Sequence, residues 1–303
     1  MGNRPPKVSV LITTRNRPDL LGRAVESVLG QTYEDYELLI VDDASTDSTA
    51  DAVEAFKDKR IRYVRRMVAG GGSAARNTGI KAAAGEYIAF LDDDDEWFPA
   101  KLEKQVAVIE RAPKEVGLVY TGVEIDGKGW NRGLERVMPG ARGDLRERLL
   151  RGSTIGSVSK VLARKECFFR AGMFDENLKS CQDWDMWLRI ADFYRFDFVP
   201  EILARIHLHG EQISSNLGSM IPGRIMMVEK HMDRFRERPE ILVIHLKRIG
   251  KLYCISGRWK EALRWFGRAV KVLPSEILKI IAWCVFGLRG ARRFARRSGF
   301  ERY

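Results

Sequence analysis

The chain has 303 residues, of which 45% are hydrophobic and 31% charged, and these ordinary values for a globular protein exclude a disordered, collagenous or multi-span membrane chain. Lys and Arg number 52 against 41 Asp and Glu, so the formal net charge is +11. This excess favours an acidic partner such as a phosphate compound, a nucleic acid or an anionic lipid.

The N-terminal part alternates between short apolar runs and helical segments that carry apolar residues on one face. We expect strands at 8–13, 37–41, 61–64 and 86–91, and helices at 19–29, 48–56 and 74–83. A polar segment follows each of these strands. The alternation predicts an α/β fold with a mostly parallel, Rossmann-like sheet, and such sheets bind ligands at the carboxyl ends of their strands.

Further along the chain we expect a strand pair at 116–125, a surface loop at 127–143, a strand at 157–163 and a helix at 182–193. After Ser215 the composition becomes helix-forming, basic and rich in Met. The sequence therefore predicts two domains, an α/β domain of residues 1–218 and a helical extension of residues 219–303.

The cysteines and the N-terminus bear on the cellular compartment. The four cysteines form no C-x-x-C pair and no regular framework, so the sequence predicts neither a zinc site nor a disulfide scaffold. The N-terminal residues are polar and contain no apolar stretch of the signal-peptide type. We therefore expect a reducing compartment and a cytoplasmic protein.

Four successive acids, Asp92 to Asp95, follow the strand at 86–91. Like charges this close together disfavour one another's ionisation, and a divalent cation offsets the repulsion. On an extended chain alternate residues share a face, which would bring Asp92 and Asp94 together. The alternative is a solvated acidic turn before the next helix, but the predicted place of the run, at a sheet edge shared with three other polar loops, favours a binding site.

Six segments resemble, in order, the motifs of family 2 glycosyltransferases with the GT-A fold, and the resemblance covers residues 6–216. The segments are VSVLITTRNRP (8–18), IVDDAS (40–45), GGSAARNTG (71–79), YIAFLDDDDEW (87–97), GMFDE (172–176) and QDWDMWLR (182–189). The resemblance implies a GT-A nucleotide-diphospho-sugar transferase fold.

The resemblance also implies a nucleotide-sugar site. The residues that match the family's first loop, which packs against the nucleoside, are Thr13, Arg15 and Asn16. Asp43 matches the carboxylate that accepts the N–H of a uracil-type base, although Asp42 and Asp43 could instead cap the following helix. Arg76 and the amides of residues 70–73 would approach the diphosphate, because glycine permits close approach of the backbone and a helix start favours anions.

A cation, Mg²⁺ or Mn²⁺, is the cofactor that the resemblance implies, because Asp92 and Asp94 match the family's DxD pair. Asp94 would bind the cation and Asp92 would face the ribose or the metal, while Asp93 is assigned to the nucleotide-sugar site without a direct metal bond. Asp93 and Asp95 are expected to be indirect neighbours of the ion or solvated. His209 aligns with a histidine near the pyrophosphate of relatives and is a candidate metal ligand, but a lone histidine is as often structural.

Asp183 matches the family's catalytic base. An inverting transfer is one in-line displacement, which needs a carboxylate opposite the leaving group to take the acceptor hydroxyl's proton. The alternative for Asp183 is a helix N-terminal charge, a role that Asp185 could also fill. Trp184 is a candidate platform for the acceptor and Trp187 a core residue. Gln182 stands where an acidic residue is common.

The C-terminal part contains two further patterns. Residues 242–275 resemble one tetratricopeptide-type helix pair, which would pack on the α/β domain or on a partner. Residues 276–288 are mostly apolar and precede five arginines, namely Arg289, Arg292, Arg293, Arg296 and Arg297. This arrangement suits binding to an anionic membrane surface. The binding would be peripheral, because the apolar stretch is too short to span a bilayer. The alternative is that the stretch packs on the helix pair.

Together these patterns predict an inverting, metal-dependent glycosyltransferase that moves a single sugar from a nucleoside diphosphate sugar, UDP-sugar favoured, to a hydroxyl acceptor. The acceptor would be a lipid-linked glycan in surface-glycan assembly, at the inner face of the cell membrane. Nucleic-acid binding is not expected, since the basic tail lacks a recognised fold for it. The alternatives are a catalytically idle nucleotide-sugar scaffold and a sugar nucleotidyltransferase, which would release pyrophosphate.

Overall fold

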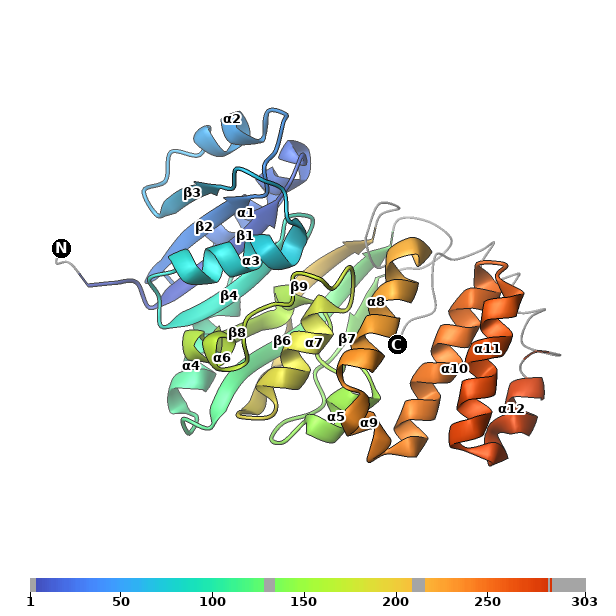
Figure 1. Ribbon diagram of the computed structural model, residues 1–303. Coiled ribbons are helices and arrows are strands. Elements are labelled where there is room, and N and C mark those ends of the chain that lie inside the picture. The colour runs from blue at the N-terminus through green and yellow to red at the C-terminus, as the bar shows by residue number, and fades with distance from the viewer. Residues whose placement is uncertain (1–3, 128–133, 209–215, 283, 285–303) are drawn as a thin grey trace.

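A mixed sheet forms the centre of the computed structural model, which describes residues 4–127, 134–208, 216–282 and 284. The strand order is β3-β2-β1-β4-β8-β6-β9-β5, and β7 pairs with β6 (Figure 1). The strands are β1 Val8–Thr14, β2 Tyr36–Asp42, β3 Ile61–Arg65, β4 Tyr87–Asp92, β5 Glu96–Trp97, β6 Val116–Gly127, β7 Glu135–Val137, β8 Val161–Arg164 and β9 Arg195–Leu208. The first four are parallel, and their predicted ends are confirmed to within one residue.

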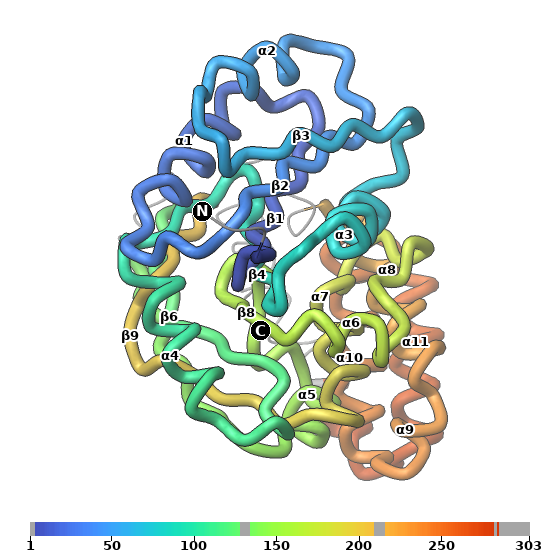
Figure 2. Tube along the Cα trace, turned by 90° about the vertical axis from the view of Figure 1, so that its left-hand side faces the viewer, coloured from blue at the N-terminus to red at the C-terminus, as the bar shows by residue number. Residues whose placement is uncertain are grey.

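Helices cover both faces of the sheet. They are α1 Pro18–Leu29, α2 Thr49–Glu54, α3 Gly71–Ala82, α4 Lys101–Arg111, α5 Arg146–Arg151, α6 Lys165–Arg170, α7 Gln182–Ile190, α8 Leu217–Lys230, α9 Met232–Arg236, α10 Pro239–Ile255, α11 Trp259–Val272 and α12 Ile277–Ala282, with short 3-10 turns η1 Val158–Lys160 and η3 Pro274–Glu276. Figure 2 shows α1 and α4 on one side of the strands and α3, α6 and α7 on the other.

Alternate residues of the central strands point to opposite faces of the sheet and belong to two different apolar cores. Val10 and Ile40 face the core that contains α1 and α4, whereas Leu11 and Leu39 face the core that contains α3, α6 and α7. A parallel strand covered on both faces is apolar throughout, which explains its continuous apolar sequence. The second core continues without interruption into α8, α10 and α11, for example through Phe266.

The helical extension is therefore packed on the same face as α7. The predicted boundary between residues 218 and 219 falls in the first turn of α8. The helix pair expected over 242–275 is present as α10 and α11, and they approach so closely that a Cβ on Gly250 would lie 2.5 Å from the Phe266 ring.

Two local predictions are wrong. The strand pair expected at 116–125 is one 12-residue strand, β6, parallel to β9. Two glycines of this strand lie where neighbouring atoms come close: a Cβ on Gly117 would lie 2.6 Å from Cys167 Sγ, and one on Gly122 2.9 Å from the Glu201 carbonyl oxygen. The strand expected at 157–163 begins at Val161, after the 3-10 turn η1.

Candidate nucleotide-sugar site

The loops that follow β1 and β2 are tied together at the carboxyl edge of the sheet. Asn16 donates its backbone N–H to Ser45 Oγ (2.9 Å), and its side-chain oxygen accepts the N–H of Thr46 (2.8 Å). Asn16 has φ +53°, a left-handed conformation that asparagine tolerates better than most residues. Arg15 is exposed beside it, and Thr13 is paired in register with Asp92 on β4.

Asp43 joins this edge to the glycine-rich start of α3. Its carboxylate accepts the N–H of Gly70 (3.0 Å), the N–H of Gly71 (2.6 Å) and a bond from the Arg66 guanidinium. The Gly70 N–H also lies 3.1 Å from the second carboxylate oxygen, so the four acceptor positions that a carboxylate offers are all engaged within the protein. The helix itself begins at Gly71, three residues earlier than the predicted 74, because these amides find their acceptor in Asp43.

Arg76 joins α3 to β4 and to α7. Its guanidinium donates to Asp92 Oδ1 (2.8 Å) and to Gln182 Oε1 (3.1 Å). Gln182 thus binds Arg76 through its side-chain oxygen. Asp183, the next residue, lies in the electrostatic field of both Arg76 and Asp92. The edge therefore brings together Asp92 and Asp183, which are remote in the sequence.

Burial dominates the titration of Asp183. Its pKa is raised to about 6, chiefly by desolvation, while the backbone N–H of Trp184 and the charge of Arg76 favour the ionised form. Lys160 of η1 lies close enough for the Asp183 charge to act on its ammonium, yet burial still lowers the pKa of Lys160 to about 8. A carboxyl that titrates near 6 is ionised at neutral pH and remains basic enough to take a proton.

The acids at the end of β4 are held by arginine and serine rather than by solvent. Arg17 Nη1 lies 3.1 Å from Asp93 Oδ1 and 3.4 Å from Asp94 Oδ2. Burial raises the pKa of Asp93 to about 6 and, with the charges of Asp92 and Asp94, raises the pKa of Asp95 well above its usual value.

Three expectations about this cluster need correction. Asp93 and Asp95 are not solvated, since both are buried and Asp95 accepts a hydrogen bond from Ser159 Oγ (2.6 Å). Asp92 and Asp94 do not share one partner, because Asp92 pairs with Arg76 while Asp94 lies beside Arg17. Burial is the main cause of the raised pKa values of Asp93 and Asp95, and the charges of Asp92 and Asp94 add the repulsion that suggested a cation.

The described residues contain no group of three or more His, Cys, Asp or Glu side chains arranged to hold a metal ion. His209 lies outside the described residues, as do the five C-terminal arginines. The neighbouring His207 is described, and its Nε2 lies 3.0 Å from Glu96 Oε1.

Trp184 is not an acceptor platform. Its side chain is only 2% exposed, and its indole N–H donates to the Leu149 carbonyl oxygen (2.5 Å). Trp187 is buried in the core as expected. Asp185 lies in the first turn of α7, where a helix N-terminal charge is possible, and it also forms ion pairs with Arg189, Lys230 and His231.

Sequence reasoning missed Arg17, Arg66 and Lys160. Arg17 belongs to the segment TTRNRP that the resemblance singled out, and its place directly before α1 could have marked it. Arg66 and Lys160 carried no signal, because their roles depend on a loop conformation and on a buried 3-10 turn.

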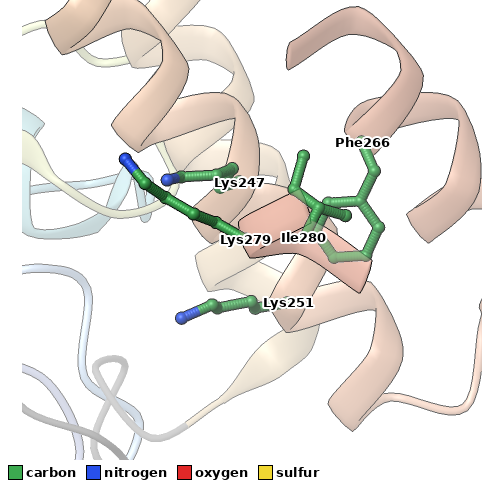
Figure 3. A pocket seen from close by; sticks show the side chains of 5 residues that line it. All are labelled: Lys247, Lys251, Phe266, Lys279 and Ile280. Atoms are coloured by element: carbon green, nitrogen blue, oxygen red, sulfur yellow. The ribbon is translucent and has the colours of Figure 1, made fainter. Parts of the chain in front are cut away.

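A separate hollow of about 200 Å³ lies in the helical extension, where Lys247, Lys251 and Lys279 surround Phe266 and Ile280 (Figure 3). Glu276 forms ion pairs with two of these lysines, Lys247 and Lys279. Across the described ranges, we find no helix with both the length and the hydropathy needed to cross a bilayer.

Comparisons with known proteins agree with this architecture. The chain is 31% identical over 234 residues to the WcaA protein of Escherichia coli, whose name refers to colanic acid biosynthesis; the match covers 76% of this chain and 83% of that protein. It is 33% identical over 223 residues to an uncharacterized glycosyltransferase of Rickettsia felis, covering 71% of this chain but only 36% of that longer protein.

Solved structures show the same fold. TarS 1–349 of S. aureus in complex with UDP-GlcNAc superposes with a TM-score of 0.66 at 20% identity, covering 95% of this chain and 87% of that one. The mannosyltransferase PcManGT of Pyrobaculum calidifontis in complex with GDP-Man and Mn²⁺ gives a TM-score of 0.60 at 21% identity, covering 97% of this chain and 84% of that one. Residues 9–176 match the family described as Glycosyl transferase family 2, and the chain belongs to this family.

Proposed function

We propose that the protein transfers one sugar from a UDP-sugar to a hydroxyl acceptor with inversion at the anomeric carbon. The observation that carries the proposal is the convergence of Asp43, Arg76 and Asp183 on one sheet edge, through the contacts of Asp43 with Gly71 and of Arg76 with Asp92 beside Asp183. Such a transfer requires an acid that binds the nucleoside, a positively charged side chain that binds phosphate and a proton acceptor, and Asp43, Arg76 and Asp183 would fill these roles in that order.

For the nucleoside, Asp43 would accept the N–H of uracil in exchange for one of its present donors, such as the Arg66 guanidinium. Asn16, Arg15 and Thr13 lie on the adjoining β1 loop, where they would contact the base and ribose. The neighbouring TarS structure contains UDP-GlcNAc, and one relative of Escherichia coli is named a UDP-Glc-dependent glucosyltransferase, which supports a UDP-sugar as the donor.

The Gly70 and Gly71 amides, which were expected to approach the diphosphate, bind Asp43 instead. For the diphosphate, the first turn of α3 would therefore supply the N–H groups of residues 72 and 73 and the positive end of a helix. Gly72 lets the chain pass close to Arg76, since a Cβ there would lie 3.2 Å from Arg76 Nη1. When a diphosphate binds, Arg76 is placed to exchange part of its contact with Asp92 for a phosphate oxygen.

The acids at the end of β4 fit a hard divalent cation such as Mg²⁺ or Mn²⁺. Carboxylate oxygens are the preferred ligands of these ions, and the mutual repulsion of Asp92, Asp94 and Asp95 creates a strongly negative site. Asp94 and Asp92 would hold the ion together with phosphate oxygens, and His209 is the further candidate ligand. Bound there, the ion supplies neutralisation of the charge that develops on the leaving diphosphate.

Asp183 would accept the proton of the acceptor hydroxyl as the new glycosidic bond forms and the bond to the diphosphate breaks. The pKa near 6 leaves its carboxylate ionised at neutral pH. Arg76 and Asp92, which both act on Asp183, would couple the base to the donor side of the site. Inversion follows because the attacking hydroxyl approaches from the face opposite to the diphosphate.

The acceptor is proposed to be a lipid-linked glycan of a surface polysaccharide, in line with the colanic acid reference in the name of WcaA. An anionic membrane surface would be contacted through the helical extension. Supporting this are the apolar side chains of Ile277, Leu278 and Ile281, which α12 exposes, and the three lysines of the nearby hollow. Sedimentation with phosphatidylglycerol vesicles, compared with neutral phosphatidylcholine vesicles, tests this attachment.

The enzymatic test uses the purified chain with Mn²⁺ and a panel of nucleotide sugars. We expect release of nucleoside diphosphate from a UDP-sugar, and loss of release on chelation by EDTA. Binding of a UDP-sugar without turnover would favour the idle scaffold, whereas pyrophosphate as product would favour a nucleotidyltransferase.

A further inference from the structure

Helix α8 of the helical extension packs directly on the segment that precedes Asp183. A Cβ placed on Gly223 would lie 2.1 Å from Ser180 Oγ and 2.9 Å from the Ser180 backbone nitrogen. Ser180 Oγ also donates to the carbonyl oxygen of Ser219 in the first turn of α8 (3.1 Å). Only glycine at position 223 allows this approach, so α8 fixes the chain three residues before the base.

A second contact fixes the chain two residues after the base. The Asp185 side chain is fully buried, with His231 Nε2 at 2.8 Å and Lys230 Nζ at 3.0 Å. Lys230 ends α8, and His231 is the residue between α8 and α9. The hydrogen bond with His231 and the charges of Arg189 and Lys230 outweigh burial and hold the pKa of Asp185 well below its usual range.

A third contact lies between these two. Arg224, next to Gly223, places its guanidinium carbon 5.4 Å from the centre of the Trp184 ring. Arg224 is itself about nine-tenths buried. Residues on both sides of Asp183 therefore contact the same helix, α8. Between Ser180 and Asp183 the chain bends at Cys181, which has φ +62°.

We propose that α8 and the α8–α9 junction form a brace that positions the carboxylate of Asp183, with Gly223 as the positioning residue that permits the contact. This inference rests on the proposed function, because it assumes that Asp183 is the base. It makes the helical extension a working part of the catalytic site rather than an attached module.

The brace has a signature in pH dependence. Burial raises the pKa of Asp183 to about 6. The charged groups around it are Arg76 from α3, which lowers this pKa, Asp92 from β4, which raises it, and Lys160 from η1. If the brace loosens, water reaches the carboxylate and the pKa falls toward its ordinary value. The acid limb of the kcat profile then moves to lower pH while kcat itself falls. If a variant only lowers the amount of folded enzyme, the measured rate falls at every pH and the acid limb of the profile stays at the same pH.

The test compares Gly223→Ala with a matched control, Gly267→Ala. Gly267 lies in α11, and a Cβ there meets nothing within 4 Å. For Gly223→Ala we expect a roughly 10- to 100-fold lower kcat, the scale of a misplacement near 1 Å, an acid limb at lower pH and unchanged UDP affinity. The control should keep the wild-type kcat and pH profile.

A second pair of variants guards against a folding failure of Gly223→Ala. Ser180→Ala removes the hydrogen bond to Ser219 and should shift the acid limb in the same direction, with a smaller loss of kcat. In the Gly223→Ala background it removes the closest atom and should restore part of kcat. Wild-type kcat in Gly223→Ala, or an unmoved limb in both single variants, overturns the brace. Full activity of Asp183→Asn instead overturns the proposed function.

Discussion

Two regions meet at the candidate site: the carboxyl edge of the sheet, with Asp43 and Asp92 to Asp95, and the segment that carries Asp183. Different parts of the chain hold these two regions in place. Asp43, Asp93 and Asp94 find the partners described above within residues 13–95, in loops that directly follow the parallel strands. Asp183 stands between Ser180 and Asp185, whose partners lie in α8 and at the α8–α9 junction.

This difference shows how one site can combine two kinds of construction. The edge is local, because parallel strands bring their carboxyl ends together whatever follows them in the sequence. The segment that carries Asp183 depends on helices that pack from far along the chain. Changes in the helical extension are therefore expected to alter turnover while nucleotide binding at the edge is retained.

The largest effect on folding is expected for Asp185→Ala. Removing this carboxylate leaves the buried His231 and the charges of Arg189 and Lys230 without their common partner, which costs about 3–5 kcal/mol of the free energy of unfolding. Urea denaturation at pH 7 measures the loss. An Asp185→Ala protein as stable as the wild type would show that the extension is not held through this residue.

Next is Asp43→Ala, which acts on the edge alone. The substitution removes the proposed acceptor for uracil and the acceptor of the Gly70 and Gly71 amides, so UDP affinity should fall about 10- to 100-fold, the scale of one or two charge-assisted hydrogen bonds. Calorimetric titration with UDP and Mn²⁺ checks this. Unchanged affinity would place the nucleoside elsewhere.

Asp183→Asn should make the fold more stable at alkaline pH. The folded-state pKa of about 6 lies above the ordinary value of 3.8 for an aspartate, so the Asp183 contribution to stability is favourable at low pH and is lost as pH rises through 6. Asparagine stays neutral, which gives a gain of about 1–3 kcal/mol at pH 8 that disappears near pH 4. Thermal unfolding at both pH values measures the gain, and equal stabilities at pH 8 would contradict the burial of an ionised base.

The smallest effect is expected for Lys160→Met. At the pH where Asp183 titrates, the Lys160 ammonium is charged, since its own pKa is about 8. Its loss raises the pKa of Asp183, so the acid limb of kcat moves to higher pH by roughly half a unit, the scale of one partly screened charge. Gly223→Ala is expected to move the same limb the opposite way. A shift of Lys160→Met to lower pH would show that Lys160 does not act on the base electrostatically.

The sequence predicts the loops at the carboxyl edge of the sheet far better than the helical contacts that support the Asp183 segment. The four parallel strands and their polar ends followed from β-branched apolar runs, and Asp43, Arg76, Asp92 and Asp183 do converge at the edge. The single long strand β6 was not predicted, because its pairing with β9 joins residues that lie about 80 positions apart, and no local pattern encodes such a contact.

The supporting residues were harder to predict for a physical reason. Gly223 and His231 matter only through contacts with residues about 40 positions earlier, and no local periodicity encodes such a contact. Lys160 has its effect because a short 3-10 turn buries it near Asp183, and Trp184 looked available only because its partner Leu149 could not be foreseen.

The most direct measurement is product analysis with the wild-type chain and Asp183→Asn, each given Mn²⁺, a UDP-sugar and a lipid-linked acceptor. We expect the wild type to release UDP and form an inverted glycoside, and Asp183→Asn to bind UDP equally well with turnover about 100- to 10,000-fold lower. Undiminished turnover by Asp183→Asn, or pyrophosphate in place of UDP, would contradict an inverting transfer in which Asp183 takes the acceptor proton.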